Sequence, residues 1–257
     1  MLLAIDIGNT NTVVGIFDGD RLACEFRIRT VRDMTEDEMY GATHRLLAAK
    51  GVSEKDVSDV IVASVVPKMR RAVDAYCDKY LGIAPVWISA DQGLGMPVLL
   101  KNPADAGADR IVNAIAAYDK YGSALIVVDF GTATTFDCIS KNGEYLGGAI
   151  SPGIGTAADA LFSKAARLPR VEIAEPPTHA IGRDTVSSMQ SGIILGYAGL
   201  VEGLVSRIKT EMEGPVTVIA TGGLAPLMAH VCPSIQAVNN DLTLYGLLLI
   251  HKRLIKQ

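Results

Sequence analysis

Short apolar runs alternate along the chain with segments of helical period. The runs at residues 2–7, 59–64 and 216–219 are typical of buried strands. Thr35 and Glu38 form a capping-box pattern, and Gly51 stands where a helix commonly ends, so we expect a helix from about 35 to 50. Alternating strands and helices predict an α/β fold with parallel strand pairing.

The rest of the chain continues this alternation. Further elements are expected as a helix opened by Pro67, a strand at 86–88, a helix entered at 107–110, a helix after Gly155, a long helix from about 185 to 211, and a final strand and helix. The stretch 168–183 contains three prolines and predicts an ordered surface loop.

Two stretches of the sequence are similar to each other. Asp6-Ile-Gly-Asn-Thr-Asn-Thr and Asp129-Phe-Gly-Thr-Ala-Thr-Thr each follow an apolar run. Each then leads to a hairpin-turn dipeptide, Asp18-Gly19 or Asn142-Gly143. The repeat predicts two duplicated α/β halves, residues 1–121 and 122–257, with a ligand-binding cleft between them.

The composition narrows the class of function. The chain has 257 residues, 49% hydrophobic and 20% charged, with a formal net charge of −4 and a mean hydropathy of +0.28. No block of like charges occurs, so we expect neither nucleic acid nor a membrane as partner. The four cysteines are scattered and are expected to be buried free thiols. Without a leader or an unbroken apolar span, the protein is expected to be cytoplasmic.

The two Asp-x-Gly turns are suited to phosphate. Glycine lets the backbone approach closely, and the amides and hydroxyls that follow can donate to phosphate oxygens. The aspartate at the strand end can hold hydrated Mg²⁺ beside a polyphosphate. Asp129-Phe-Gly copies the protein-kinase magnesium triplet, but the other kinase motifs are missing. An aspartic-protease dyad disagrees with the many helix signals, and the absence of Gly-Lys excludes a P-loop.

Three further motifs are candidates for a binding site. Thr221-Gly-Gly ends a predicted strand and could face adenosine, or could be an ordinary strand-to-helix turn. Small residues at 147–153 precede a helix and could offer free amides to phosphate. Asp109 and Arg110 fall in the first turn of a helix, where the aspartate could simply favour the helix dipole. A carboxylate that accepts a hydroxyl proton beside an arginine that grips a carboxylate also suits a kinase for a small hydroxy acid.

Taken together, these motifs resemble the type III pantothenate kinases, of the acetate kinase, sugar kinase, Hsp70 and actin superfamily. The resemblance covers Asp6-x-Gly-Asn-Thr, Gly107-x-Asp-Arg, Asp129-x-Gly-Thr-Ala, the 147–153 segment and Thr221-Gly-Gly, in that order. It implies two ribonuclease H-like (actin-like) domains around a central cleft. The implied activity is ATP-dependent phosphorylation of pantothenate, the first step towards coenzyme A. It also implies Mg²⁺, a monovalent cation (K⁺ or NH₄⁺), and a homodimer with pantothenate near the interface.

The resemblance also implies roles for individual residues. Asp109 would be the base, Asp129 would bind K⁺, and Asp6 would hold Mg²⁺ through water. ATP would be bound by Asp6, Ile7, Gly8, Asn9, Thr10, Asn11, Thr12, Val13, Thr132, Thr221, Gly222 and Gly223. Pantothenate would be bound by Gly107, Ala108, Asp109, Arg110 and Thr185, with Asp184 as the alternative to Thr185 if the register slips by one.

One position departs from the family pattern, and two other functions stay open. The family often has a tyrosine where this chain has Leu100, which affects the polar part of pantothenate recognition. Another kinase or a polyphosphate phosphatase of the superfamily would keep both phosphate turns and use a different acceptor. A non-catalytic regulator would bind the nucleotide without turnover.

Overall fold

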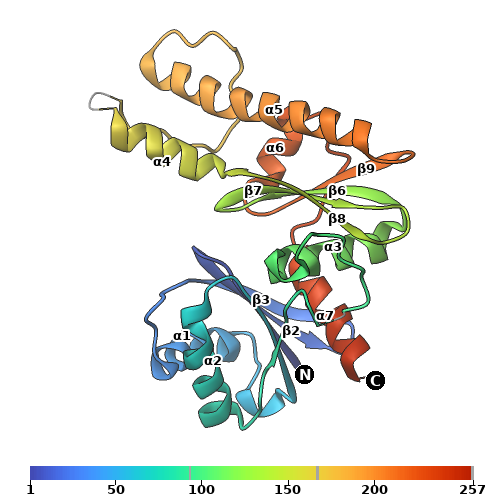
Figure 1. Ribbon diagram of the computed structural model, residues 1–257. Helices are drawn as coiled ribbons and strands as arrows, with labels where there is room; N and C mark the ends of the chain where they lie inside the picture. The colour runs from blue at the N-terminus through green and yellow to red at the C-terminus, as the bar shows by residue number, and fades with distance from the viewer. Residues whose placement is uncertain (93, 166–167, 256–257) are drawn as a thin grey trace. The chain divides into compact units, whose positions relative to one another are not determined.

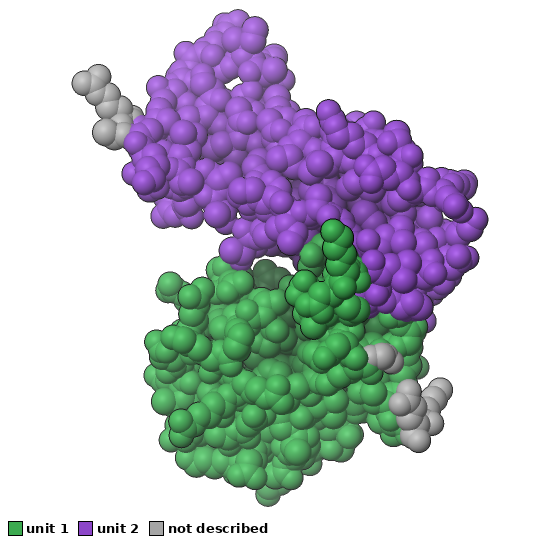
Figure 2. All heavy atoms as spheres, in the orientation of Figure 1, with its two compact units in different colours: residues 1–96, 100–116, 243–257 green, residues 97–99, 117–242 purple. Residues whose placement is uncertain are grey.

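The computed structural model describes residues 1–92, 94–165 and 168–255. Its internal contacts divide the chain into two units, which Figure 2 shows in separate colours. Unit 1 comprises residues 1–96, 100–116 and 243–257, and unit 2 comprises 97–99 and 117–242. Apart from residues 97–99, the chain therefore passes from unit 1 to unit 2 within the helix Ala108–Tyr121 and returns to unit 1 near residue 243. The division expected from the sequence, between residues 121 and 122, would instead place residues 243–257 in the second half.

Unit 1 is built on a five-stranded mixed sheet in the order β3-β2-β1-β4-β5. Its strands are β1 (Leu2–Ile7), β2 (Asn11–Asp18), β3 (Arg21–Arg29), β4 (Asp59–Ser64) and β5 (Val86–Trp87). β1 pairs antiparallel with β2 and parallel with β4, and β3 is the edge strand beside β2. Gly19, with φ of +60°, lies in the predicted β2–β3 turn.

Two helices cover one face of this sheet. α1 (Glu36–Ala49) starts with the predicted Thr35–Glu38 capping box and has three acidic residues in its first turn, which favour the helix dipole. The helix expected after Pro67 is a 3₁₀ turn (Pro67–Met69), then α2 (Arg70–Tyr76), then a π turn (Cys77–Leu81). Further short 3₁₀ turns lie at Glu54–Asp56 and Pro103–Asp105.

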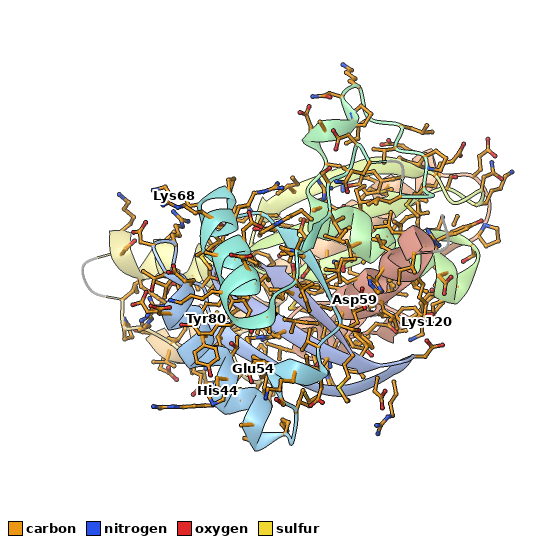
Figure 3. All side chains as sticks on the ribbon, turned by 90° about the horizontal axis from the view of Figure 1, so that it is seen from below. His44, Glu54, Asp59, Lys68, Tyr80 and Lys120 are labelled. Carbon is orange, nitrogen blue, oxygen red and sulfur yellow. The ribbon has the colours of Figure 1, made fainter. Side chains whose placement is uncertain are left out.

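Aromatic side chains join these helices at the surface of unit 1. Tyr40 of α1 stacks on Tyr80 with ring centroids 4.0 Å apart. His44, one turn further along α1, lies with its Nδ1 2.7 Å from Glu54 Oε1. Figure 3 labels His44, Glu54 and Tyr80, which lie near one another. Beneath them, Met39, Leu47 and Tyr76 are fully buried against the sheet.

The opposite face of the unit 1 sheet is packed by α7 (Leu242–Ile255). A Cβ built on Gly15 of β2 would lie only 2.8 Å from Leu244 Cδ1, so this glycine allows helix and strand to approach closely. Gly246 of α7 is similarly tight against Val112 of α3 (Ala108–Tyr121). His251 Nε2 lies 3.6 Å from Asp59 Oδ1 at the start of β4. The C-terminal helix thus completes the core of unit 1.

Unit 2 repeats the same sheet in the order β10-β9-β6-β7-β8. Its strands are β6 (Ala124–Phe130), β7 (Ala133–Ile139), β8 (Tyr145–Pro152), β9 (Val216–Thr221) and β10 (Ala237–Val238). β6 pairs antiparallel with β7 and parallel with β9, as β1 does with β2 and β4. The predicted α/β fold with two duplicated halves is therefore confirmed.

Three helices pack on one face of the unit 2 sheet. They are α4 (Ile154–Lys164), α5 (Thr185–Glu211) and α6 (Ala225–Val231), which Figure 1 draws on the same side of β6 and β7. Their buried side chains share a core with Phe136 and Val128. The bounds of α5 match the sequence expectation, and the stretch 168–183 forms no helix or strand, as predicted.

Two further sequence expectations concern apolar character. All four cysteines are buried free thiols, as expected.

Among the described residues, α5 is long and apolar enough to span a bilayer by length and composition, and 33% of its most apolar window is buried within the chain. Core helices of soluble proteins pass the same test, and Ile194, Val201 and Val205 of α5 belong to the unit 2 core.

Candidate active site

The first candidate phosphate turn joins β1 to β2 in unit 1. The Gly8 amide donates to Asn11 O at 3.0 Å and closes the turn. A Cβ at residue 8 would lie 3.0 Å from that oxygen, which is tighter than side chains normally tolerate. Asn9 and Thr10 are exposed at the tip, while Asp6 at the strand end is half-buried. The turn therefore offers backbone and hydroxyl groups to solvent next to a carboxylate.

Thr30 holds this turn from behind, a role that the motifs did not reveal. Its amide donates to Thr10 O at 2.9 Å, and its hydroxyl donates to Gly8 O at 2.8 Å. The hydroxyl of Thr12, which is buried, lies 2.9 Å from the same Thr30 oxygen. These bonds satisfy polar groups on the inner side of the turn, while Asn9 and Thr10 at its tip are exposed to solvent. The only signal in the sequence is a threonine directly after an edge strand.

The second turn joins β6 to β7 in unit 2 and has the same closure. The Gly131 amide donates to Ala133 O at 3.0 Å. Thr132 is exposed, and its carbonyl accepts from the Gly153 amide at 3.0 Å and from the Thr156 hydroxyl at 2.7 Å. A Cβ on Gly153 would lie 2.4 Å from Gly131 O. Gly153, in the glycine-rich 147–153 segment, thus allows α4 to support the turn.

Unit 2 also brings Thr221 and Gly222 to Asp129. Asp129 of β6 pairs in register with Thr221 of β9. Gly222 has φ of +90°, and a Cβ there would lie 2.4 Å from Asp129 Oδ1. Gly223 follows on the exposed side. The second turn and the Thr221-Gly-Gly motif therefore form one local arrangement around the Asp129 carboxylate.

Asp109 lies in the first turn of α3, as predicted. Its Oδ1 accepts the Arg110 amide at 2.8 Å. A Cβ on Gly107 would lie 2.5 Å from that same oxygen, so a side chain there would displace the Asp109 carboxylate. Burial raises the pKa of Asp109, while the Arg110 amide and the charge of Arg110 oppose the increase. A carboxylate with a raised pKa is a better proton acceptor than an ordinary aspartate.

Asp184 and Thr185 start α5 at the edge of a separate cavity. The Ser187 amide donates to Asp184 Oδ1 at 2.9 Å, and this bond holds the pKa of Asp184 below its usual range. Asp184 is thus the helix cap, while Thr185 is exposed. An open cavity of about 710 Å³ in unit 2 is lined by Leu161, Leu168, Gly182, Arg183, Asp184, Thr185, Ser188, Met189, Gly192 and Ile193.

Each of the two turns could supply only part of the ligands that a hard cation needs. No cluster of three or more His, Cys, Asp or Glu side chains able to hold a metal occurs in the described ranges. Asp6 and Asp129 would each supply one carboxylate, with water and phosphate oxygens completing the coordination. Mg²⁺ commonly keeps several waters and binds through one or two carboxylates beside phosphates. The residues present therefore fit a nucleotide-bound cation better than a cage built by protein alone.

Comparison with solved structures identifies the fold. A Campylobacter jejuni protein described as a Baf family transcriptional activator has a TM-score of 0.62 at 18% identity, covering 99% of this chain and 100% of that one. The Clostridium difficile activator of 2-hydroxyisocaproyl-CoA dehydratase has a TM-score of 0.57 at 13% identity, covering 100% and 97%. The Thermus thermophilus ROK hexokinase has a TM-score of 0.54 at 15% identity, covering 100% and 99%. These structures share the duplicated actin-like fold with this chain.

The sequence comparisons identify the family. The family described as type III pantothenate kinase matches residues 2–207. A type III pantothenate kinase from Desulfatibacillum aliphaticivorans is 61% identical over 253 residues, 98% of each chain. One from Desulfosudis oleivorans is 54% identical over 250 residues, 97% of this chain and 98% of that one. The chain belongs to the type III pantothenate kinase family.

Proposed function

We propose that this protein transfers the γ-phosphoryl group of ATP to the primary hydroxyl of pantothenate, giving 4'-phosphopantothenate, the first step of coenzyme A biosynthesis. Family membership over nearly the whole chain supports the substrate. The observation that carries the chemistry is Asp109, a carboxylate of raised pKa on the first turn of α3, directly followed by Arg110. Such a pair suits a hydroxy acid as substrate, because the aspartate can accept the hydroxyl proton and the arginine can bind the carboxylate.

ATP is bound through the two turns and the Thr221-Gly-Gly motif. Residues 6–13 and Thr132 receive the phosphates, and Thr221, Gly222 and Gly223 face the adenosine. Support comes from the exposed tips of both closed turns and from the glycines that keep side chains away from them. A related solved structure, the dehydratase activator, was determined with bound ADPNP.

Cations neutralise the phosphate charge. Asp6 would hold Mg²⁺ through water, and Asp129 would bind a monovalent cation, K⁺ or NH₄⁺. When bound, these ions offset the negative charge that otherwise repels an attacking oxygen. Single carboxylates at the two strand ends support this arrangement, since phosphate and water supply the other ligands.

Asp109 acts as the general base. Its carboxylate accepts the proton of the pantothenate hydroxyl as that oxygen attacks the γ-phosphorus. The bond to the β,γ-bridging oxygen breaks in line, ADP leaves, and the proton passes from Asp109 to solvent. Positioning and charge neutralisation provide most of the rate in such a transfer. Gly107, Ala108 and Arg110 bind the substrate next to this base, with the Arg110 guanidinium on its carboxylate.

Thr185 completes the pantothenate site, in preference to Asp184. Both oxygens of Asp184 are occupied by Ser187, whose amide and hydroxyl each donate at 2.9 Å. The Thr185 hydroxyl makes no hydrogen bond within the described chain and lies on the open cavity of unit 2. It can therefore donate to a substrate without giving up a bond that the helix needs.

The active form is a homodimer in the cytoplasm, with α5 at the subunit interface. Gly192, Gly196 and Gly199 of α5 have no atom within 4 Å of a built Cβ. A glycine inside a helix costs about 1 kcal/mol relative to alanine. A second helix that packs closely against these glycines would account for this cost.

The test is ADP release with a panel of acceptors. Purified protein is given MgATP with pantothenate, glucose or acetate, with and without K⁺, and polyphosphate is offered in separate assays as the phosphoryl donor and as a substrate for hydrolysis. Release that needs both pantothenate and K⁺ supports the proposal. Release with another acceptor, phosphate release from polyphosphate, or nucleotide binding without turnover would contradict it.

A further inference from the structure

Two arginines of the edge strand β3 lie beside the first phosphate turn. Arg27 pairs across the sheet with Val13, and Val13 pairs with Asp6. Arg29 pairs with Asn11, at the foot of the turn. Residues 27 and 29 point to the same face because side chains alternate along a strand. Asp6, Val13 and Arg27 therefore form one row across three strands on one face of the unit 1 sheet.

Helix α7 covers one end of this face, and the side chains at the other end, near the turn, are more exposed. At the covered end, Gly15 packs against Leu244 of α7. Towards the turn, Asp6 and Val13 are half-buried, and Arg27 and Arg29 are exposed. With neighbouring strands about 4.8 Å apart, the Cα atoms of Asp6 and Arg27 are separated by roughly 10 Å. An arginine side chain extended across the sheet is long enough to place its guanidinium above Val13, towards the Asp6 carboxylate.

Neither guanidinium has a partner within the described chain. Arg27 and Arg29 make no ion pair or side-chain hydrogen bond with any described residue. By contrast, Arg21 at the far end of β3 lies 3.5 Å from Asp18. A guanidinium presents a fixed fork of donors that matches carboxylate or phosphate oxygens in pairs. Two unpaired forks beside a phosphate turn are suited to an anion from solution.

We propose that Arg27, assisted by Arg29, binds an oxyanion of a substrate and holds it beside the first turn. The inference rests on the proposed function, which supplies two such anions: the phosphate chain of ATP and the carboxylate of pantothenate. Asp6 would hold a hydrated cation that offsets part of the phosphate charge, and Arg27 would supply further positive charge from the neighbouring edge strand. The arginines thus add a cationic edge to a turn otherwise made of amides and hydroxyls.

The test compares Arg27→Gln and Arg27→Lys with a matched control, Arg21→Gln. The control removes an exposed arginine from the same strand at its other end. For each variant, KM and kcat are measured for ATP and for pantothenate. Equilibrium titrations then measure the affinities of a non-hydrolysable ATP analogue and of pantothenate at two ionic strengths. Thermal unfolding shows whether each variant folds like the wild type.

Arg27→Gln is expected to raise the KM and dissociation constant of one substrate by roughly tenfold, the scale of a hydrogen bond to a charged group. An effect on ATP identifies the phosphate chain, and an effect on pantothenate identifies the carboxylate. Arg27→Lys should recover part of the loss, and the difference from wild type should shrink at high salt because exposed charges are screened. Arg21→Gln should behave like the wild type.

The inference is overturned if Arg27→Gln, folded as well as the wild type, changes both affinities by less than about twofold. It is also overturned if Arg21→Gln produces an equal loss. Failure of the proposed function is a separate result, namely no ADP release by wild type with pantothenate. The analogue and pantothenate titrations still report on Arg27 in that case.

Discussion

Gly222 packs directly against the carboxylate of Asp129. A Cβ at residue 222 would lie 2.4 Å from Asp129 Oδ1 and 2.8 Å from the Phe130 backbone, and φ there is +90°. The glycine therefore meets two demands at once, a left-handed backbone conformation and space for the carboxylate. The Thr221-Gly-Gly motif and the Asp129 turn depend on each other in a way that neither motif reveals alone.

Gly222→Ala should displace Asp129 and impair the enzyme. We expect a loss of roughly 1–3 kcal/mol in unfolding free energy from crowding and backbone strain, together with weaker activation by K⁺. Gly155→Ala is the control, because a Cβ there meets nothing within 4 Å and lies in helix α4. Denaturant unfolding and K⁺ titration of the rate measure both effects. Equal behaviour of the two variants would contradict the packing argument.

Asp109→Asn tests the assignment of the base. Asparagine keeps the size of the side chain but cannot accept the hydroxyl proton, so kcat should fall by roughly 10²–10⁴-fold. The affinity for an ATP analogue should stay close to that of the wild type. Steady-state kinetics and a nucleotide titration measure the two quantities. A loss of kcat below about tenfold would remove Asp109 from this role.

The raised pKa of Asp109 has a consequence for pH dependence. The base must be ionised, so kcat/KM should fall with decreasing pH through a pKa above the usual range of aspartate. Arg110 opposes the rise, so Arg110→Ala should move this acid limb to higher pH and raise the KM for pantothenate. A pH profile of each protein provides the check. An unchanged profile and KM in Arg110→Ala would mean that Arg110 serves the fold instead.

The same shift predicts an effect on stability. A carboxyl whose pKa is raised by folding binds protons more tightly in the folded state, so its unfavourable contribution is absent below the unfolded pKa and complete above the folded pKa. Asp109→Asn should therefore be more stable than wild type near neutral pH, with the difference vanishing in acid. Unfolding free energies at several pH values measure this. A difference that grows in acid would have the wrong sign.

Thr30 is expected to set the shape of the first turn. Thr30→Val removes the bond to Gly8 O and leaves the buried Thr12 hydroxyl without that partner. We expect a cost of about 1–3 kcal/mol in unfolding free energy and a raised KM for ATP. Thr30→Ser retains the hydroxyl and should recover most of both. If Thr30→Val keeps the wild-type KM for ATP, the turn does not need this support.

The exposed glycines of α5 predict a close helix–helix contact between subunits. Gly196→Leu places a large side chain in the open space at this position and should shift the protein from dimer to monomer. Gly41→Leu is the control, because Gly41 lies in helix α1 with nothing within 4 Å of its Cβ. Light scattering after gel filtration measures the mass of each. A dimeric Gly196→Leu protein would place the interface elsewhere.

Local signals predicted much of the fold. The Thr35–Glu38 capping box, the Asp18-Gly19 turn and the apolar run at 59–64 each depend on neighbours in sequence, and each appears where expected. Relations between distant segments were not predictable in this way. The return of α7 to unit 1 depends on the close approach of Gly15 to Leu244 and of Gly246 to Val112, and no local pattern encodes these contacts.

The candidate site, too, was predictable only where it depends on residues that are close in sequence. Its aspartates and glycines are recognisable because turn geometry demands them at fixed spacing. Thr30 and Gly153 act through hydrogen bonds to the two turns, and the position of Arg27 beside Asp6 follows from the pairing of β1, β2 and β3. These relationships become visible only when the three-dimensional arrangement is known.

The most direct test of the central claim is product analysis. Wild type and Asp109→Asn are incubated with pantothenate, MgATP and K⁺, and the product is characterised by mass spectrometry and phosphorus NMR. The account predicts stoichiometric 4'-phosphopantothenate and ADP with wild type, with phosphate on the primary hydroxyl and a greatly reduced rate in the variant. ADP formation without phosphorylated pantothenate, or equal rates for both proteins, would contradict it.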